Sequence, residues 1–135
     1  MNVLMQIGLV ALGSALGGLA RWGVGVAMGR QFGVAFPWGT LFINLTGSLF
    51  LGWFTTLLPQ REFDLGGLSL RPDHLRLMLA VGFTGAYTTF STFELESHDL
   101  LKDGDGMLAM LYVFGSVAGG LLAVRAGVWL ARAMG

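Results

Sequence analysis

Long apolar segments alternate with short polar ones along the whole chain. Hydrophobic residues dominate residues 3–28, 36–58, 74–101 and 107–134, and each segment approaches or exceeds the ~20 residues that cross a bilayer as a helix. Turn residues separate them, with Pro59 ending the second segment and the sequence KDGDG preceding the fourth. The pattern predicts an all-α membrane protein, in which residues 1–135 form a single domain of four transmembrane helices.

The composition supports this class of protein. The 135 residues are 54% hydrophobic and only 12% charged, with a mean hydropathy of +0.69, whereas soluble domains have about 25% charged residues. The absence of cysteine excludes disulfides and thiolate metal sites. Eight basic residues balance eight acidic ones, and no basic run is long enough to predict nucleic-acid binding. Lys and Arg are divided so evenly between the two sides of a four-helix protein that they specify its orientation only weakly.

Two apolar segments carry polar or small residues at a spacing of four. That spacing places them on one face of a helix: Thr40, Asn44 and Ser48 in the second segment, and Tyr112, Ser116 and Gly120 in the fourth. Buried polar groups cost free energy unless they are paired, so these residues either join helices by hydrogen bonds or line a polar track through the membrane. For Asn44 alone the two interpretations have equal weight, and its two aligned neighbours favour the track.

The sequence GFTGAYTTFSTFELES, residues 82–97, concentrates glycine, threonine and serine in the third apolar segment. This composition predicts either a glycine-kinked continuous helix or a helix broken near residues 82–88. Irregular backbone at membrane depth persists only where it is buried in protein or coordinates something. Free carbonyl oxygens without a nearby carboxylate favour a monovalent cation over a divalent one.

Two phenyl rings follow the predicted break. Phe90 and Phe93 are three residues apart and share a helix face, and Ser91 and Thr92 place hydroxyls beside them. Ring edges carry positive potential, so edges and hydroxyls together could replace the water around a small anion without trapping it. Arg21 is either an arginine that reaches the interface beside Trp22 or a positive charge in an anion vestibule, and both interpretations stay open.

Glycine pairs at a spacing of four predict close helix packing and no chemistry. The pairs are Gly13 with Gly17, Gly25 with Gly29, and Gly115 with Gly119.

Several stretches resemble one known family over all four predicted helices. They are GGLARW, FPWGTLFINLTGSLFLG, GFTGAYTTFSTFELES and YVFGSVAGG, and they resemble the small bacterial fluoride channels called Fluc or CrcB. The resemblance implies a multi-pass protein of the bacterial inner membrane that exports fluoride passively. It also implies an inverted, dual-topology homodimer with two separate pores and a central structural sodium ion.

The resemblance assigns roles residue by residue. Asn44 matches the pore asparagine, Phe90 and Phe93 match the rings beside the fluoride path, and Arg21 matches an arginine near the pore entrance. The implied polar track comprises Ser91, Thr92, Thr40, Tyr112 and Ser116. The backbone carbonyls of Gly85 and Thr88, from both subunits, would hold the sodium ion, and Glu96 matches a family glutamate at a helix end.

This sequence departs from the family pattern at three places: Ala86-Tyr87, Gly120, and the loop 60–73, which is longer than usual. A small dual-topology transporter of another substrate remains the main alternative, although its proton coupling would normally use a carboxylate within the membrane, and the first two predicted helices contain none. A purely structural membrane protein is a third possibility. An enzyme is not expected, because the apolar segments contain no nucleophile–base pair and no ligand cluster.

Overall fold

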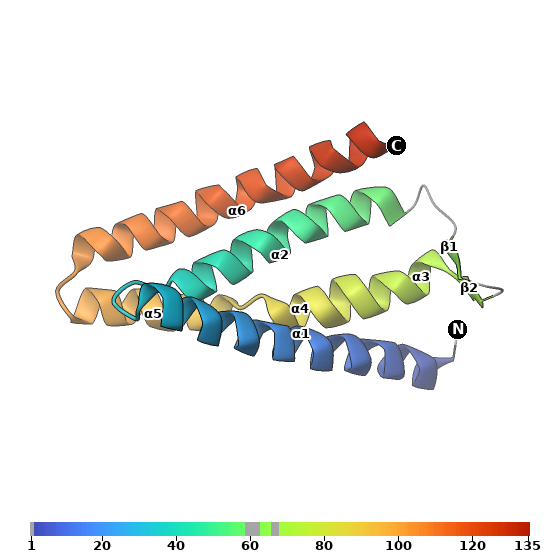
Figure 1. Cartoon of the computed structure of the whole chain (residues 1–135), viewed down its shortest axis with the longest axis horizontal. Coiled ribbons are helices and arrows are strands. Elements are labelled where there is room, and N and C mark those ends of the chain that lie inside the picture. Colours follow the sequence, from blue (N-terminus) through green and yellow to red (C-terminus); the bar gives the residue numbers. More distant parts are fainter. Residues whose placement is uncertain (1, 59–62, 66–67) are drawn as a thin grey trace.

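The computed structural model describes residues 2–58, 63–65 and 68–135. Its long helices lie side by side along one axis, with both termini at one end and two tight turns at the other (Figure 1). The longest elements are α1 (Val3–Phe32), α2 (Trp38–Leu57) and α6 (Gly106–Met134). Between α2 and α6 the chain forms β1 (Phe63–Leu65), β2 (Leu68–Leu70), α3 (Pro72–Leu75), the π-helical segment η2 (Arg76–Thr84), α4 (Gly85–Tyr87) and α5 (Phe90–Lys102).

Three of these helices, α1, α2 and α6, are long and apolar enough to cross a membrane. The chain is therefore a multi-pass membrane protein, as its composition predicts. The third predicted segment is not among these three, because the structure divides it into several shorter helical elements.

The segment between α2 and α3 differs from the polar loop that its sequence predicts. Within the described residues, β1 and β2 pair antiparallel, with Phe63 opposite Leu70 and Leu65 opposite Leu68. This short hairpin lies in the connection between α2 and α3, and the all-α class that the sequence predicts is confirmed. The other elements of the described residues are helical.

The third predicted segment changes helix type and then stops being helical. Its middle part, η2, is a π-helix, in which the Thr84 hydroxyl donates to the Leu79 carbonyl five residues earlier, at 2.8 Å. α4 ends at Tyr87, and Thr88 and Thr89 are extended, with ψ of 158° and 120°. The non-helical residues thus lie at the end of the stretch expected to contain the break, and residues 82–87 are helical.

Glycines bring two pairs of helices into backbone contact. A Cβ at Gly13 or Gly17 of α1 would collide with the backbone of η2, at Met78 and Phe83 respectively. Gly13 and Gly17 therefore serve close packing, as their spacing predicts. Gly82 is part of the same seam, since its Cβ would lie 2.8 Å from the Val10 carbonyl oxygen.

The second close contact joins α2 to α6. A Cβ at Gly52 would collide with the Val124 backbone, and a Cβ at Gly127 would collide with the Leu49 backbone. These two glycines lie on different helices, so no spacing along the sequence relates them. In contrast, no atom lies within 4 Å of a Cβ built at Gly25, Gly29 or Gly115, whereas a Cβ at Gly119 would lie 2.9 Å from the Leu45 side chain.

Much of the apolar surface faces outward. One buried cluster joins α5 and α6 through Phe93, Leu100, Ala109 and Tyr112. Large apolar side chains on the outer faces of α1 and α6 are exposed, among them Leu12, Leu16, Leu19, Leu111, Phe114, Leu121 and Leu122. An exposed face of this kind suits contact with lipid or with another membrane helix.

Candidate functional site

The non-helical residues at the end of α4 are held by one side chain of α2. The Asn44 amide donates from Nδ2 to the Thr89 carbonyl at 3.0 Å, and its Oδ1 accepts from the Thr89 N–H at 2.9 Å. Asn44 thereby satisfies both backbone groups of a residue that is 9% exposed. Buried backbone groups need such partners wherever a helix is interrupted.

This pairing changes the hydrogen bonding of the last turn of α4. In a continuous helix the Thr89 N–H would donate to the Gly85 carbonyl, but here it donates to Asn44. The preceding turn is still closed, since the Thr88 N–H and hydroxyl both donate to the Thr84 carbonyl, at 3.0 and 2.9 Å. The carbonyls of Gly85 and Thr88 thus lie where regular helical pairing ends, and Gly85 is exposed.

A second connection from α2 reaches Tyr87, on the other side of the helix interruption at Thr88 and Thr89. The Thr46 hydroxyl lies 2.9 Å from the Tyr87 hydroxyl and also donates to the Phe42 carbonyl at 2.7 Å. Because Thr46 has a single hydroxyl hydrogen, Tyr87 is the donor to it. Gly47 follows Thr46 in α2, and a Cβ there would collide with the Thr88 side chain.

α5 begins with hydroxyl groups. The Thr89 Oγ1 accepts from the Thr92 N–H at 3.2 Å and caps the helix, and it donates to the Thr92 hydroxyl at 3.0 Å. The Ser91 hydroxyl lies 3.5 Å from the same oxygen. Ser91 and Thr92 are both exposed, so the structure brings these two predicted residues together beside the interruption.

Aromatic rings extend from the interruption toward the end of the molecule that carries the tight turns. Phe90 and Phe93 have their ring centroids 5.9 Å apart, Phe93 lies 5.2 Å from Tyr112, and Tyr112 lies 5.5 Å from Phe36 in an edge-on arrangement. Phe93 and Tyr112 are buried, at 7% and 1% exposure, whereas Phe90 is 73% exposed. One ring of the predicted pair is therefore fixed in the core and the other is not covered within this chain.

Glu96 is the centre of a second polar group, one turn beyond Phe93. Its carboxylate accepts from the Thr40 hydroxyl at 2.8 Å and from the Tyr112 hydroxyl at 2.6 Å. Thr40 and Tyr112 are buried, and the three residues come from α2, α5 and α6. No spacing in the sequence links Glu96 to Thr40 or Tyr112, because these partners lie on other helices.

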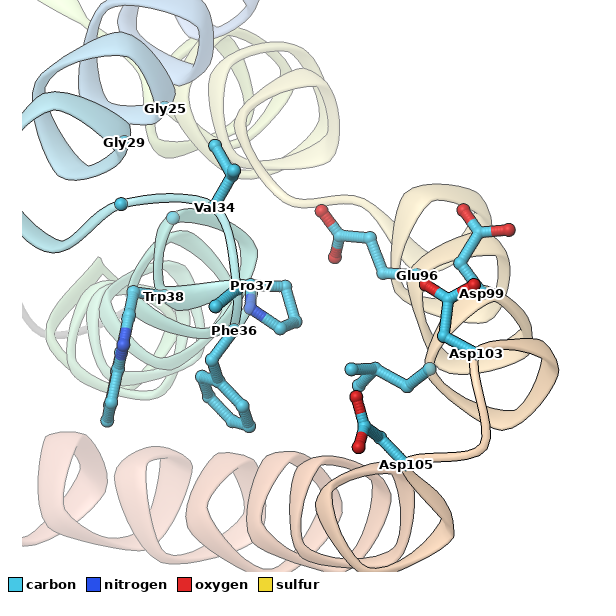
Figure 2. Close-up of a pocket in the computed structure, with 14 residues that line it drawn as sticks. Gly25, Gly29, Val34, Phe36, Pro37, Trp38, Glu96, Asp99, Asp103 and Asp105 are labelled. Atoms are coloured by element: carbon cyan, nitrogen blue, oxygen red, sulfur yellow. The ribbon is translucent and has the colours of Figure 1, made fainter.

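Two hollows adjoin these groups. A cavity of about 240 Å³ is lined by residues that surround the interruption: Asn44, Gly47, Ser48, Leu51, Thr84, Thr88, Thr89 and Phe90. A larger one of about 440 Å³ opens beside Glu96. Figure 2 shows carboxylates of Glu96, Asp99, Asp103 and Asp105 on one side of it and the residues of the α1–α2 turn on the other.

Two residues that the sequence assigns to the ion path, Ser116 and Arg21, have no polar partner within the described residues. The Ser116 Oγ on α6 is buried and makes no hydrogen bond within the described residues. Arg21 on α1 is half-buried, and the described part of the chain provides neither a hydrogen bond nor an ion pair for it. The structure therefore does not join Arg21 to the polar groups around Asn44 and Glu96.

Comparison with known proteins relates most of the chain to one family. The family described as CrcB-like protein, Camphor Resistance (CrcB), matches residues 8–128. The chain belongs to the CrcB-like family. The resemblance seen in its sequence motifs is confirmed by this match.

Curated relatives of this CrcB-like chain have a common name, fluoride-specific ion channel FluC. The protein of Chloroflexus aurantiacus is 45% identical over 126 residues, which cover 93% of this chain and 94% of the relative. The protein of Trichormus variabilis is 41% identical over 93% of this chain and 88% of the relative, and that of Nitrobacter winogradskyi is 46% identical over 91% and 92%. These relatives are ion channels by name, in agreement with the prediction that this chain is not an enzyme.

Proposed function

We propose that the chain is a fluoride-selective channel that lets fluoride leave the cell passively. The names of its relatives support this proposal. The structural observation that carries it is the pairing of Asn44 with Thr89, which holds non-helical backbone next to Phe90. A helix of hydrocarbon-facing residues would have no reason to keep such an arrangement.

The groups around the interruption suit a small, strongly hydrated anion. The Asn44 amide has two donor hydrogens, and only one is used by the Thr89 carbonyl. The second hydrogen, the hydroxyls of Ser91 and Thr92, and the ring edges of Phe90 and Phe93 supply donors and weak positive potential without a fixed charge. From there we assign the path to Glu96 and its partners Thr40 and Tyr112, with the unpaired Ser116 hydroxyl beside it.

A single chain leaves this path open on one side. Phe90 is 73% exposed, and Ser91, Thr92 and Gly85 are exposed as well. We propose that a second, inverted copy covers this face, so that the dual-topology homodimer encloses two pores, each bounded by residues of both subunits. Four membrane crossings per subunit, with η2 to α5 as the third, belong to the same proposal. Arg21, which has no partner within the described part of the chain, would lie at a pore entrance.

The proposal includes a structural sodium ion between the subunits. The donor set fits a monovalent cation, because the carbonyls of Gly85 and Thr88 are neutral oxygens at the end of regular helical pairing and Asn44 diverts the donor that Gly85 would otherwise have. Bound there, sodium would add positive field to both pores. The residues of this chain contribute the fixed backbone, through Asn44 on one side and Thr46 with Tyr87 on the other.

The test is fluoride efflux from liposomes that contain the purified protein, measured with a fluoride electrode against chloride-loaded liposomes. We expect rapid loss of fluoride and retention of chloride. Phe93→Ile should suppress efflux, because it removes a buried ring of the path, whereas Phe114→Ile, on the outer face of α6 and 67% exposed, should not. Equal efflux through both variants would contradict the assigned path.

Two further outcomes separate the parts of the proposal. Slow, saturable efflux with no fluoride preference would favour the alternative, a small dual-topology transporter of another substrate. Sodium is tested by the stability of the detergent-purified dimer in sodium and in N-methylglucamine buffers. Equal stability in both would remove the sodium site while leaving the fluoride path intact.

A further inference from the structure

The C-terminal part of α6 carries two arginines and a tryptophan on one exposed face. Arg125, Trp129 and Arg132 are separated by four and three residues, the spacing that aligns side chains along a helix. All three are exposed, and they line one hollow of about 460 Å³. Helix α6 packs against α2 through other residues, such as Gly127 and the fully buried Ala131.

The depth of Arg125 makes this face unusual. Gly120 lies at the middle of α6, so the Cα of Arg125 is about 7.5 Å from the centre of the helix, that of Trp129 about 13.5 Å and that of Arg132 about 18 Å. Half of the hydrocarbon core measures about 15 Å. Arg125 therefore begins inside the hydrocarbon, whereas Trp129 is level with the interface and Arg132 lies just beyond it.

Arg125 cannot easily leave this position. Cα–Cβ bonds in a helix tilt toward its N-terminus, which for Arg125 is away from the nearer interface. Its guanidinium stays charged, and an intramembrane charge requires a partner. Among the described residues the only ion pair joins Arg71 to Asp73, so this part of the chain offers Arg125 no carboxylate.

We infer that this face binds the phosphate of an anionic phospholipid, with phosphatidylglycerol as the simplest example. A phosphate drawn inward to the level of Trp129 would lie about one helical turn from both arginines and would accept hydrogen bonds from both guanidinium groups. Trp129, which is 69% exposed, provides the amphipathic ring that is typical of this depth. The charge complementarity favours an anionic lipid over a zwitterionic one.

Native mass spectrometry of the full-length protein in neutral detergent tests this inference. The protein is titrated with phosphatidylglycerol or with phosphatidylcholine of the same acyl chains, and retained lipid is counted. Each arginine near the headgroup contributes about five-fold in affinity, so we expect a preference of roughly 30-fold for phosphatidylglycerol. Arg125→Gln/Arg132→Gln should abolish the preference, and Arg30→Gln, which removes an exposed arginine elsewhere, should keep it.

Two results would overturn the inference directly: equal retention of the two lipids by the unaltered protein, or a preference that survives in the double glutamine variant. Loss of the dimer in that variant, regardless of lipid, would also overturn it and would assign this face to a second copy of the chain. If the double variant does not fold, Arg125→Lys/Arg132→Lys keeps the charges and loses the paired hydrogen bonds. That variant should retain part of the preference, and an unchanged preference would contradict guanidinium recognition.

Discussion

Replacing Asn44 with alanine tests the most specific contact in the structure. The substitution removes two hydrogen bonds, of 3.0 and 2.9 Å, and leaves the N–H and carbonyl of Thr89 without partners. Hydrogen bonds between membrane helices average about 0.6 kcal/mol each, which gives a lower bound of about 1.2 kcal/mol. Each buried backbone group left unpaired costs about 1–3 kcal/mol. For the two groups together we therefore expect a loss of about 2–6 kcal/mol in the free energy of unfolding.

The loss can be measured by unfolding in mixed micelles of dodecyl maltoside and dodecyl sulfate. Thr55→Ala is the matched control, since Thr55 is exposed on the same helix and its hydroxyl donates only to the Leu51 carbonyl of α2. Its effect should stay below about 0.5 kcal/mol. Hydrogen exchange gives a second readout, because the Thr89 amide should exchange about 30-fold faster or more in the Asn44 variant. If Asn44→Ala unfolds at the same detergent ratio as Thr55→Ala, the hydrogen bonds between Asn44 and Thr89 do not stabilise the non-helical backbone at Thr88 and Thr89.

Other substitutions test packing, the group around Glu96 and the acidic hollow. Gly127→Val should destabilise the fold by about 1–3 kcal/mol in the same unfolding assay, because the valine side chain would collide with the backbone of α2. Gly115→Val is the control and should change the stability little, because no atom lies near its Cβ position. Similar effects of both substitutions would contradict the packing of α2 on α6. Tyr112→Phe removes the hydroxyl that donates to the Glu96 carboxylate at 2.6 Å. This change should lower the free energy of unfolding by about 1.5–3 kcal/mol and slow fluoride efflux. Full stability and full efflux would show that this hydrogen bond is dispensable. Asp103→Asn/Asp105→Asn removes two negative charges from the hollow beside Glu96 and should raise fluoride efflux roughly two-fold at about 10 mM salt. At about 1 M salt, where charges are screened, efflux should not rise. A gain independent of salt would exclude an electrostatic cause.

The sequence predicted the helical segments and the residues on polar faces better than it predicted their partners. Apolar length and turn residues placed α1, α2 and α6 to within a few residues. The four-residue spacing places Thr40 and Asn44 on one face of α2, and the structure shows that both bind residues of the third segment. Both features depend only on residues close together in the sequence, which is why periodicity detects them.

What sequence reasoning missed depends on contacts between helices. Glu96 looks like part of a solvated helix end until Thr40 and Tyr112, which are far from it in the sequence, are found beside it. The interruption was expected from residue 82 onward because glycines bend helices, but Gly82 serves contact with α1 and the backbone departs from helix only at Thr88. One signal was present: Thr89 is of a residue type that caps helix N-termini, and its hydroxyl oxygen accepts from the Thr92 N–H.

The π-helical segment limits where this chain can lose a residue. Such a helix has five-residue rather than four-residue pairing, so the loss of one codon within residues 76–84 would let ordinary α-helical pairing take over. The rise and the rotation per residue would then change within this segment. Met78 and Phe83 could not both keep the positions at which Gly13 and Gly17 let their backbones approach α1. Loss of a residue here would therefore disturb the seam with α1, whereas the turn around Gly104, where φ is 85° and neighbouring backbone is exposed, can absorb the same change at little cost.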